Sequence, residues 1–255
     1  MSQKLVVGNW KLNGSLVANE TLLRAIVPVD GVEVAVCVPF PYLAQVAAWS
    51  RGKTGGKTGG GIALGAQTVS EHGAGAYTGE VGAAMLADFG CRYVIVGHSE
   101  RRSLFGEDDA LVGRKAAAAL AAGLTPIVCT GESLGERDGG QAMAVIGRQL
   151  GAVLDVMGGE GFRGAVIAYE PVWAIGSGRA ASVAEVEEVH GCIRAWCDAQ
   201  GVAGQGMRIL YGGSVKAGNA RALFALPGVD GGLVGGASLV AADFMAICRA
   251  ASGGD

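Results

Sequence analysis

The sequence has few charged and few aromatic side chains, and its charges are nearly balanced. Charged residues make up 17% of the 255 residues, aromatic residues make up 6%, and the formal net charge at pH 7 is −3. Nucleic acids and anionic membranes attract strongly basic surfaces, which this composition does not favour. No apolar run reaches the roughly 20 residues that a membrane-spanning helix needs. We therefore expect neither nucleic acid nor a membrane among the partners.

Cysteines are present, but their spacing shows no pairing. None of the six forms a C-x-x-C motif, and several lie inside apolar strand-like segments. Scattered cysteines of this kind are typical of reduced, buried thiols in a cytoplasmic protein. The chain runs from Met1 directly into the strand-like segment at Leu5, without the apolar core of a signal peptide. We therefore expect a cytoplasmic location.

Apolar residues, in contrast, make up 50% of the chain, and glycine is abundant at 45. Short apolar segments alternate with longer amphipathic ones, a pattern that predicts eight strand–helix pairs. The predicted strands are Lys4–Trp10, Glu33–Val38, Ile62–Ala66, Tyr93–Gly97, Leu124–Cys129, Ala165–Tyr169, Met207–Tyr211 and Gly231–Val234. The predicted helices are Leu16–Ile26, Tyr42–Ser50, Val81–Asp88, Asp108–Ala122, Gly139–Met157, Val183–Gln200, Asn219–Leu226 and Leu239–Ala251.

Eight such pairs in roughly 250 residues predict an α/β fold with a single (β/α)8 barrel domain over residues 1–255. An open doubly wound sheet is the alternative, but it calls for a glycine-rich fingerprint after the first strand, and Gly8-Asn9-Trp10-Lys11 is not one. Residues 51–61 contain two Gly-Lys-Thr triplets without the spacing of a P-loop. We expect this segment to be a flexible insertion.

Polar side chains end three of the predicted strands. Alternate residues of a strand share a face, so each polar end continues an apolar stripe. The stripes are Leu5, Val7, Asn9 and Lys11; Val94, Val96 and His98; and Val166, Ala168 and Glu170. If they line the barrel interior, Lys11, His98 and Glu170 converge at its C-terminal mouth, where barrel enzymes carry their chemistry. Singly they could be a rim cation, a core histidine and a solvated carboxylate, but their coincidence favours a catalytic site.

Glycine pairs follow the last two strands. Ser214 comes after Gly212-Gly213, and Gly235-Gly236 follows the eighth strand. Backbone N–H groups near a helix start can hold a phosphate without a lysine clamp. Either turn alone could be an ordinary strand-to-helix connection. Both together, with Gly176 from the loop after the sixth strand, predict a phosphate-binding cradle.

Together these motifs resemble the triosephosphate isomerase family over nearly the whole chain. The matching segments are Gly8–Lys11, Gly97–Arg102, Ala168–Gly178, Tyr211–Val215 and Gly235-Gly236. The resemblance implies a TIM barrel and an intramolecular aldose–ketose isomerase. Its reaction interconverts D-glyceraldehyde 3-phosphate and dihydroxyacetone phosphate through an enediol(ate), in glycolysis and gluconeogenesis. That proton shift needs no metal and no other cofactor.

The resemblance also implies roles for individual residues. Glu170 is expected to be the base, and His98, as neutral imidazole, to polarise the carbonyl and shuttle protons. Lys11 is expected to hold negative charge and Asn9 to donate to the developing oxyanion. The expected phosphate ligands are Gly176, Ser214, Gly235 and Gly236, with contributions from Asn9 and Lys11. Glu100 and Cys129 are expected to support this shell from behind.

The resemblance further implies a lid and a homodimer. Pro171–Trp173 and Ser177–Ala180 are the expected hinges of a lid over the phosphate. The loop Gly73–Glu80 is expected to reach into a partner subunit and place Thr78 near the partner's Asn9 and Lys11. The sequence departs from the usual residues of the family at four positions. Leu12 replaces Met, Thr68 replaces Asn, Ser177 replaces Thr and Arg179 replaces Lys.

Two other functions compete with this interpretation. One is a phosphate-binding barrel acting on a different sugar or heterocycle phosphate, which predicts a changed base or electrophile. The other is a catalytically silent barrel that serves as a binding protein, which predicts the loss of Lys11, His98 or Glu170. All three residues are present.

Overall fold

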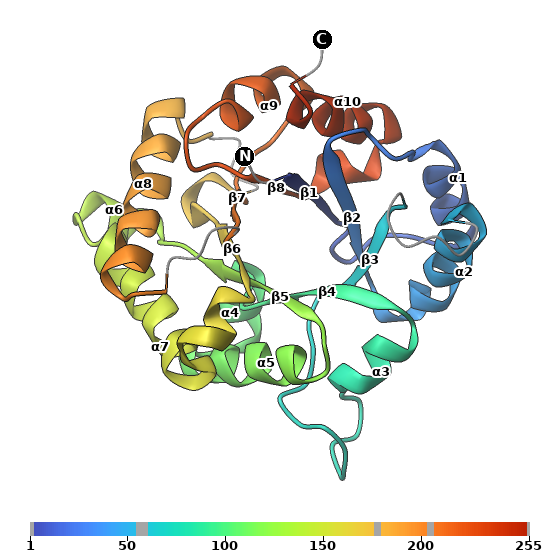
Figure 1. The fold of residues 1–255 in the computed structure, drawn as a ribbon, viewed down its shortest axis with the longest axis horizontal. Helices are drawn as coiled ribbons and strands as arrows, with labels where there is room; N and C mark the ends of the chain where they lie inside the picture. The colour runs from blue at the N-terminus through green and yellow to red at the C-terminus, as the bar shows by residue number, and fades with distance from the viewer. Residues whose placement is uncertain (1–2, 55–60, 176–179, 203–206, 254–255) are drawn as a thin grey trace.

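Eight parallel strands close into one barrel, with each strand beside the next in sequence and β8 beside β1. The computed structural model describes residues 3–54, 61–175, 180–202 and 207–253. Figure 1 looks down the barrel and shows the helices as a ring around it. The strands are β1 Lys4–Asn9, β2 Val32–Val38, β3 Ala63–Ala66, β4 Cys91–Val96, β5 Thr125–Thr130, β6 Val166–Tyr169, β7 Ile209–Tyr211 and β8 Gly231–Val234. The chain is thus a (β/α)8 TIM barrel, as predicted.

The helices fall where amphipathic segments were expected, with additions near the barrel mouth. The α-helices are α1 Leu16–Ala25, α2 Leu43–Thr54, α3 Ala83–Asp88, α4 Ser99–Phe105, α5 Asp109–Ala121, α6 Leu134–Asp138, α7 Ala142–Arg163, α8 Val183–Ala199, α9 Ala217–Phe224 and α10 Ala241–Ala251. Single turns of 3-10 helix are η1 Phe40–Tyr42, η2 Val172–Ala174 and η3 Gly236–Leu239. Because α2 continues to Thr54, it takes up the first residues of the predicted 51–61 insertion, and residues 55–60 lie outside the described part.

The helix predictions missed two short helices, α4 and α6, and ended α7 too early. The short helix α4 follows β4 directly and was not predicted, because its sequence SERRSLF is mostly polar and shows no apolar stripe. The helix predicted to end at Met157 continues to Arg163 across a break at Gly158, whose φ of 67° is not helical. Glycine adopts this left-handed conformation without the steric penalty of a side chain. In the described residues, no helix is long and apolar enough to cross a bilayer.

The core has two layers, one inside the barrel and one between strands and helices. Leu5, Val7, Val166 and Ala168 lie inside, so the stripes predicted for β1 and β6 face the interior as expected.

The stripe predicted for β4 was wrong, because Val94 and Val96 pack outward against the helices while Tyr93 and Ile95 point inward. His98 nevertheless reaches the mouth. Gly97, with a φ of 68°, interrupts the alternation just before it.

A buried histidine packs behind β6 and β7. His190 of α8 is fully buried, and its ring centroid lies 5.9 Å from that of Tyr169 and 6.4 Å from that of Tyr211. Its Nδ1 lies 3.1 Å from the Gly228 carbonyl oxygen, to which the neutral ring donates. Burial lowers the pKa of His190 to about 4; the Gly228 hydrogen bond opposes this shift and the charge of Arg194 adds to it.

We predict that His190 makes the fold acid-sensitive. Its pKa is lower in the folded than in the unfolded chain, so its stabilising contribution is complete above pH 6.5 and is lost as the pH falls toward 4. At about 1.4 kcal/mol per pKa unit, lowering the pH from 7 to 5 should cost about 2 kcal/mol of unfolding free energy. Urea unfolding at a single protein concentration measures this. His190→Asn, which keeps a donor for Gly228, should have a lower unfolding free energy at pH 7, and that free energy should change less between pH 7 and pH 5 than in the wild type. An equal change in variant and wild type would contradict the role of His190.

Candidate active site

A cavity of about 500 Å³ lies at the C-terminal mouth of the barrel. It gathers residues that follow β1, β4, β6, β7 and β8. Its walls include seven predicted site residues, Asn9, Lys11, His98, Glu170, Ser214, Gly235 and Gly236. The eighth predicted wall residue, Gly176, lies outside the described residues, as do Ser177, Gly178 and Arg179 of the second lid hinge. The structure thus brings together the polar strand ends and the glycine turns.

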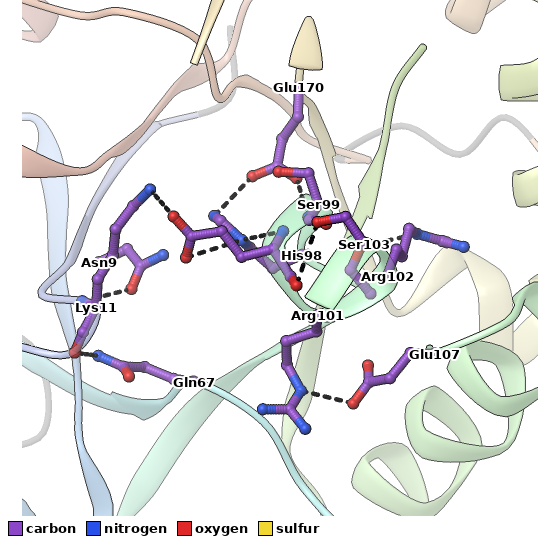
Figure 2. A network of polar contacts seen from close by, with 12 residues as sticks. Asn9, Lys11, Gln67, His98, Ser99, Arg101, Arg102, Ser103, Glu107 and Glu170 are labelled. Carbon is purple, nitrogen blue, oxygen red and sulfur yellow. Dashed lines mark hydrogen bonds and ion pairs between the residues drawn. The ribbon is translucent and has the colours of Figure 1, made fainter. Parts of the chain in front are cut away.

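Lys11 stands at the end of β1 in an unusual backbone conformation. Its φ of 51° is the one positive value among the non-glycine residues that the structure describes. The Asn9 side-chain oxygen accepts from the Lys11 N–H at 3.0 Å, and Gln67 donates to the Lys11 carbonyl at 2.9 Å. Its ammonium group pairs with Glu100 at 2.5 Å (Figure 2). Such over-determined strain is a common feature of functional sites.

His98 is the N-terminal cap of α4. Its Nδ1 accepts a hydrogen bond from the Glu100 N–H at 3.2 Å, and its Nε2 lies 3.0 Å from Oε1 of Glu170. An imidazole nitrogen that accepts an N–H must have a free lone pair, so the proton of the ring is on Nε2. The geometry therefore supports a neutral imidazole that donates into the cavity.

Glu170 follows β6 and is almost completely buried. Its second oxygen, Oε2, accepts from the Ser99 N–H at 2.9 Å, and its own N–H donates to the Thr130 carbonyl at 2.7 Å. Gly131 lies directly against this backbone: a β-carbon at position 131 would stand 1.7 Å from the Glu170 carbonyl oxygen. Only glycine fits at position 131. This close approach of the two backbones fixes the position of the Glu170 main chain, from which its side chain extends.

Burial and charge act in opposite directions on these two side chains. Burial alone lowers the pKa of His98, but the Glu170 carboxylate more than offsets it, and the net direction is upward. The Glu100 N–H opposes protonation, because it donates to an Nδ1 lone pair that the charged ring does not have, and this contact is why we assign the neutral ring. Burial alone raises the pKa of Glu170, but His98 and the Ser99 N–H bring it below its ordinary value. Glu170 is therefore an ionised carboxylate near neutral pH, with the Ser99 N–H on one oxygen and Nε2 of His98 at 3.0 Å from the other.

The two predicted supporting residues lie beside the cavity. Glu100 contacts Lys11, and its Oε2 lies 3.6 Å from Nδ1 of His98. Cys129 of β5 is fully buried. Burial raises the pKa of this thiol well above its ordinary value, and the Glu170 charge raises it further. It stays protonated and adds no charge under the carboxylate.

Several residues at the site were not predicted. Lys216, Val240 and Asp243 line the outer rim of the cavity and are exposed. Glu132 is fully buried beneath the lid root, where it accepts from the Tyr169 hydroxyl at 3.1 Å and the Trp173 ring N–H at 2.8 Å. Glu132 follows the fifth strand just as Glu170 follows the sixth, so its position alone could have marked it as a candidate site residue. Its hydrogen-bonding partners are distant in sequence and could not be predicted.

Comparison with known proteins points to one family over nearly the whole chain. The family model described as "Triosephosphate isomerase" matches residues 4–251. A triosephosphate isomerase of Azoarcus sp. (strain BH72) is 60% identical over 255 residues, covering 98% of this chain and 100% of that protein. That of Thiobacillus denitrificans is 58% identical, covering 99% and 100%, and that of Bordetella pertussis is 56% identical, covering 97% of each. The chain belongs to the triosephosphate isomerase family.

Proposed function

We propose that this protein interconverts D-glyceraldehyde 3-phosphate and dihydroxyacetone phosphate in the cytoplasm, in glycolysis and gluconeogenesis. The observation that carries the proposal is the pair at the floor of the cavity, an ionised Glu170 carboxylate 3.0 Å from the Nε2–H of a neutral His98. Moving a proton between adjacent carbons needs a base on the carbon side and a donor facing the two oxygens. The pair supplies both.

The resting geometry also implies what the substrate has to change. Oε1 of Glu170 and Nε2 of His98 are in contact at 3.0 Å, so the proposed base and electrophile face each other before substrate binds. A bound carbonyl oxygen takes the His98 Nε2–H and frees Oε1 of Glu170. A carboxylate that leaves its donors is a stronger base, because those donors are what lower its pKa. Substrate binding thus activates Glu170 where the proton is to be removed.

The negative charge of the intermediate lies within reach of two further groups. Lys11 supplies a cation and Asn9 an amide on the β1 side of the cavity. Preorganised donors of this kind stabilise a developing enediolate without reorganising during the reaction. The phosphate lies along the backbone of Ser214, Gly235 and Gly236, next to the start of η3. Gly176, which lies outside the described residues, is proposed as a further phosphate ligand.

We expect Glu170→Gln to lower kcat by about 10²–10⁴-fold, the usual contribution of a general base. The substitution keeps the size of the side chain and removes its basicity. A coupled assay that reduces dihydroxyacetone phosphate with NADH measures turnover, and circular dichroism checks folding. Glu188→Gln, an exposed position on α8, is the matched control and should keep full activity. A folded Glu170→Gln variant within tenfold of the wild type would rule out Glu170 as the base.

We further propose that the protein is a homodimer joined through loop Gly73–Glu80. Large apolar side chains are exposed after β1, β3 and β4: Leu12 is 96% exposed, Leu104 73%, Phe105 67% and Met85 50%. Large exposed apolar side chains that gather into a patch mark an interaction site, and we propose that these four do so. The loop extends outward from the barrel beside α3 (Figure 1). In the dimer, Thr78 lies near the partner's Asn9 and Lys11.

The dimer can be tested at Met85, which is exposed on α3. Met85→Glu places a charge where the apolar contact should be, and the loss of such a contact costs about 2 kcal/mol, roughly a thirtyfold weaker association. Sedimentation velocity over a dilution series measures it. Val183→Glu, at an exposed apolar position on α8, is the control. Equal association of Met85→Glu and wild type would place the interface elsewhere.

A further inference from the structure

A second cavity lies behind Glu170. It has a volume of about 260 Å³ and lies between α4 and the segments around β5, α6 and α7. Its lining residues are Gly97, Ser99, Arg102, Ser103, Thr130, Gly131, Ser133, Glu136, Gln149, Glu170 and Val172. We call it the back cavity, and the substrate-side cavity the front cavity. Nothing in the reaction described above uses the back cavity.

Glu170 is the one residue that lines both cavities among those the structure describes. Its two oxygens also point to different cavities. Oε1 lies against His98, which lines the front cavity only, and Oε2 accepts from Ser99, which lines the back cavity only. Figure 2 shows the carboxylate between these two residues, with Ser103 one helical turn beyond Ser99. The carboxyl group is therefore a partition between the two spaces.

The wall of the back cavity is suited to water. Ser99, Ser103, Thr130 and Ser133 line it, together with Gln149. The hydroxyls of Ser103, Thr130 and Ser133 donate to protein oxygens, which leaves their own oxygens to accept from water. Ser103 and Ser133 are exposed, so the cavity opens to bulk solvent on its outer side. Water occupies a cavity when the walls offer it hydrogen-bonding partners and there is room for it. Both conditions are met here, with space for several molecules.

We propose that the back cavity is the water-filled passage through which the proton carried by Glu170 in mid-reaction exchanges with solvent. The inference rests on the proposed role of Glu170 as the base. The base takes a proton from one carbon, holds it as a carboxylic acid, and returns a proton to the neighbouring carbon. While the proton is held, bound substrate fills the front cavity and excludes water there. The back cavity stays open, since Val172 is its one wall residue from the lid root, η2.

The exchange needs one rotation and no further reactant. The acid proton lies at first on the oxygen that faces the substrate. Half a turn about the Cγ–Cδ bond, a torsion with a broad two-fold profile, moves that oxygen to the Ser99 side. There the O–H gives its proton to a water of the back cavity and the water returns one of its own. The carboxylic acid is regenerated, and the hydrogen delivered to the product comes from solvent.

The test blocks the outer mouth of the back cavity and measures how much of the hydrogen removed from the substrate is returned to the product. Ser103 is exposed, lines the cavity and does not touch the reacting groups. Ser103→Met fills the mouth, and Ser103→Ala is the matched control that removes the hydroxyl without adding bulk. Each variant converts protiated glyceraldehyde 3-phosphate in D₂O, with the product trapped by NADH-dependent reduction. Proton NMR then gives the fraction of product that retains the substrate hydrogen.

We expect Ser103→Met to raise the retained fraction about threefold or more with kcat unchanged, because the proton transfers themselves do not use the back cavity. Ser103→Ala should match the wild type. Equal retention in Ser103→Met and wild type, or complete retention in wild type, would overturn the inference. An absence of turnover in the wild type would instead overturn the proposed function. Ser103→Leu repeats the test if circular dichroism shows that Ser103→Met folds poorly.

Discussion

The 3.0 Å contact between Nε2 of His98 and Oε1 of Glu170 is the interaction on which the site depends. An ionised carboxylate as deeply buried as Glu170 costs several kcal/mol unless its oxygens are satisfied. The Ser99 N–H donates to one oxygen, and Nε2 of His98 lies 3.0 Å from the other. The resting protein therefore tolerates a buried charge on Glu170, and we propose that the same contacts restrain this base until a substrate carbonyl takes its place beside His98.

One short helix start makes this arrangement possible. The first turn of α4 directs the Ser99 N–H at Glu170 and the Glu100 N–H at Nδ1 of His98, so it positions one side chain and sets the tautomer of the other. Glu170 follows β6, two strands away around the barrel, and β5 lies between. There Gly131 permits the backbone of Glu170 to approach closely. The base and the electrophile are thus placed by the barrel wall.

The sequence was sufficient for the barrel and for the position of its site, for one physical reason. Strands that run parallel in a closed barrel bring all their C-terminal ends to one mouth, so polar residues such as Lys11 and Glu170 must meet there. Features that depend on one backbone torsion could not be predicted. Gly97 breaks the alternation between β4 and His98, so His98 reaches the mouth although Val94 and Val96 face outward, and the residue pattern carries no sign of this. Glu132 was missed because its role depends on partners brought near only by folding.

The burial of Glu170 also sets conflicting demands on its surroundings. The enediolate needs a dry front cavity, since water there would promote loss of the phosphate. A base sealed on every side would return only the hydrogen it had taken. Because the two oxygens of Glu170 face different cavities, the wall that keeps water from the intermediate need not keep it from the carboxyl group. A carboxylate has two equivalent oxygens and can meet both demands at once, which a base with a single titrating atom could not do.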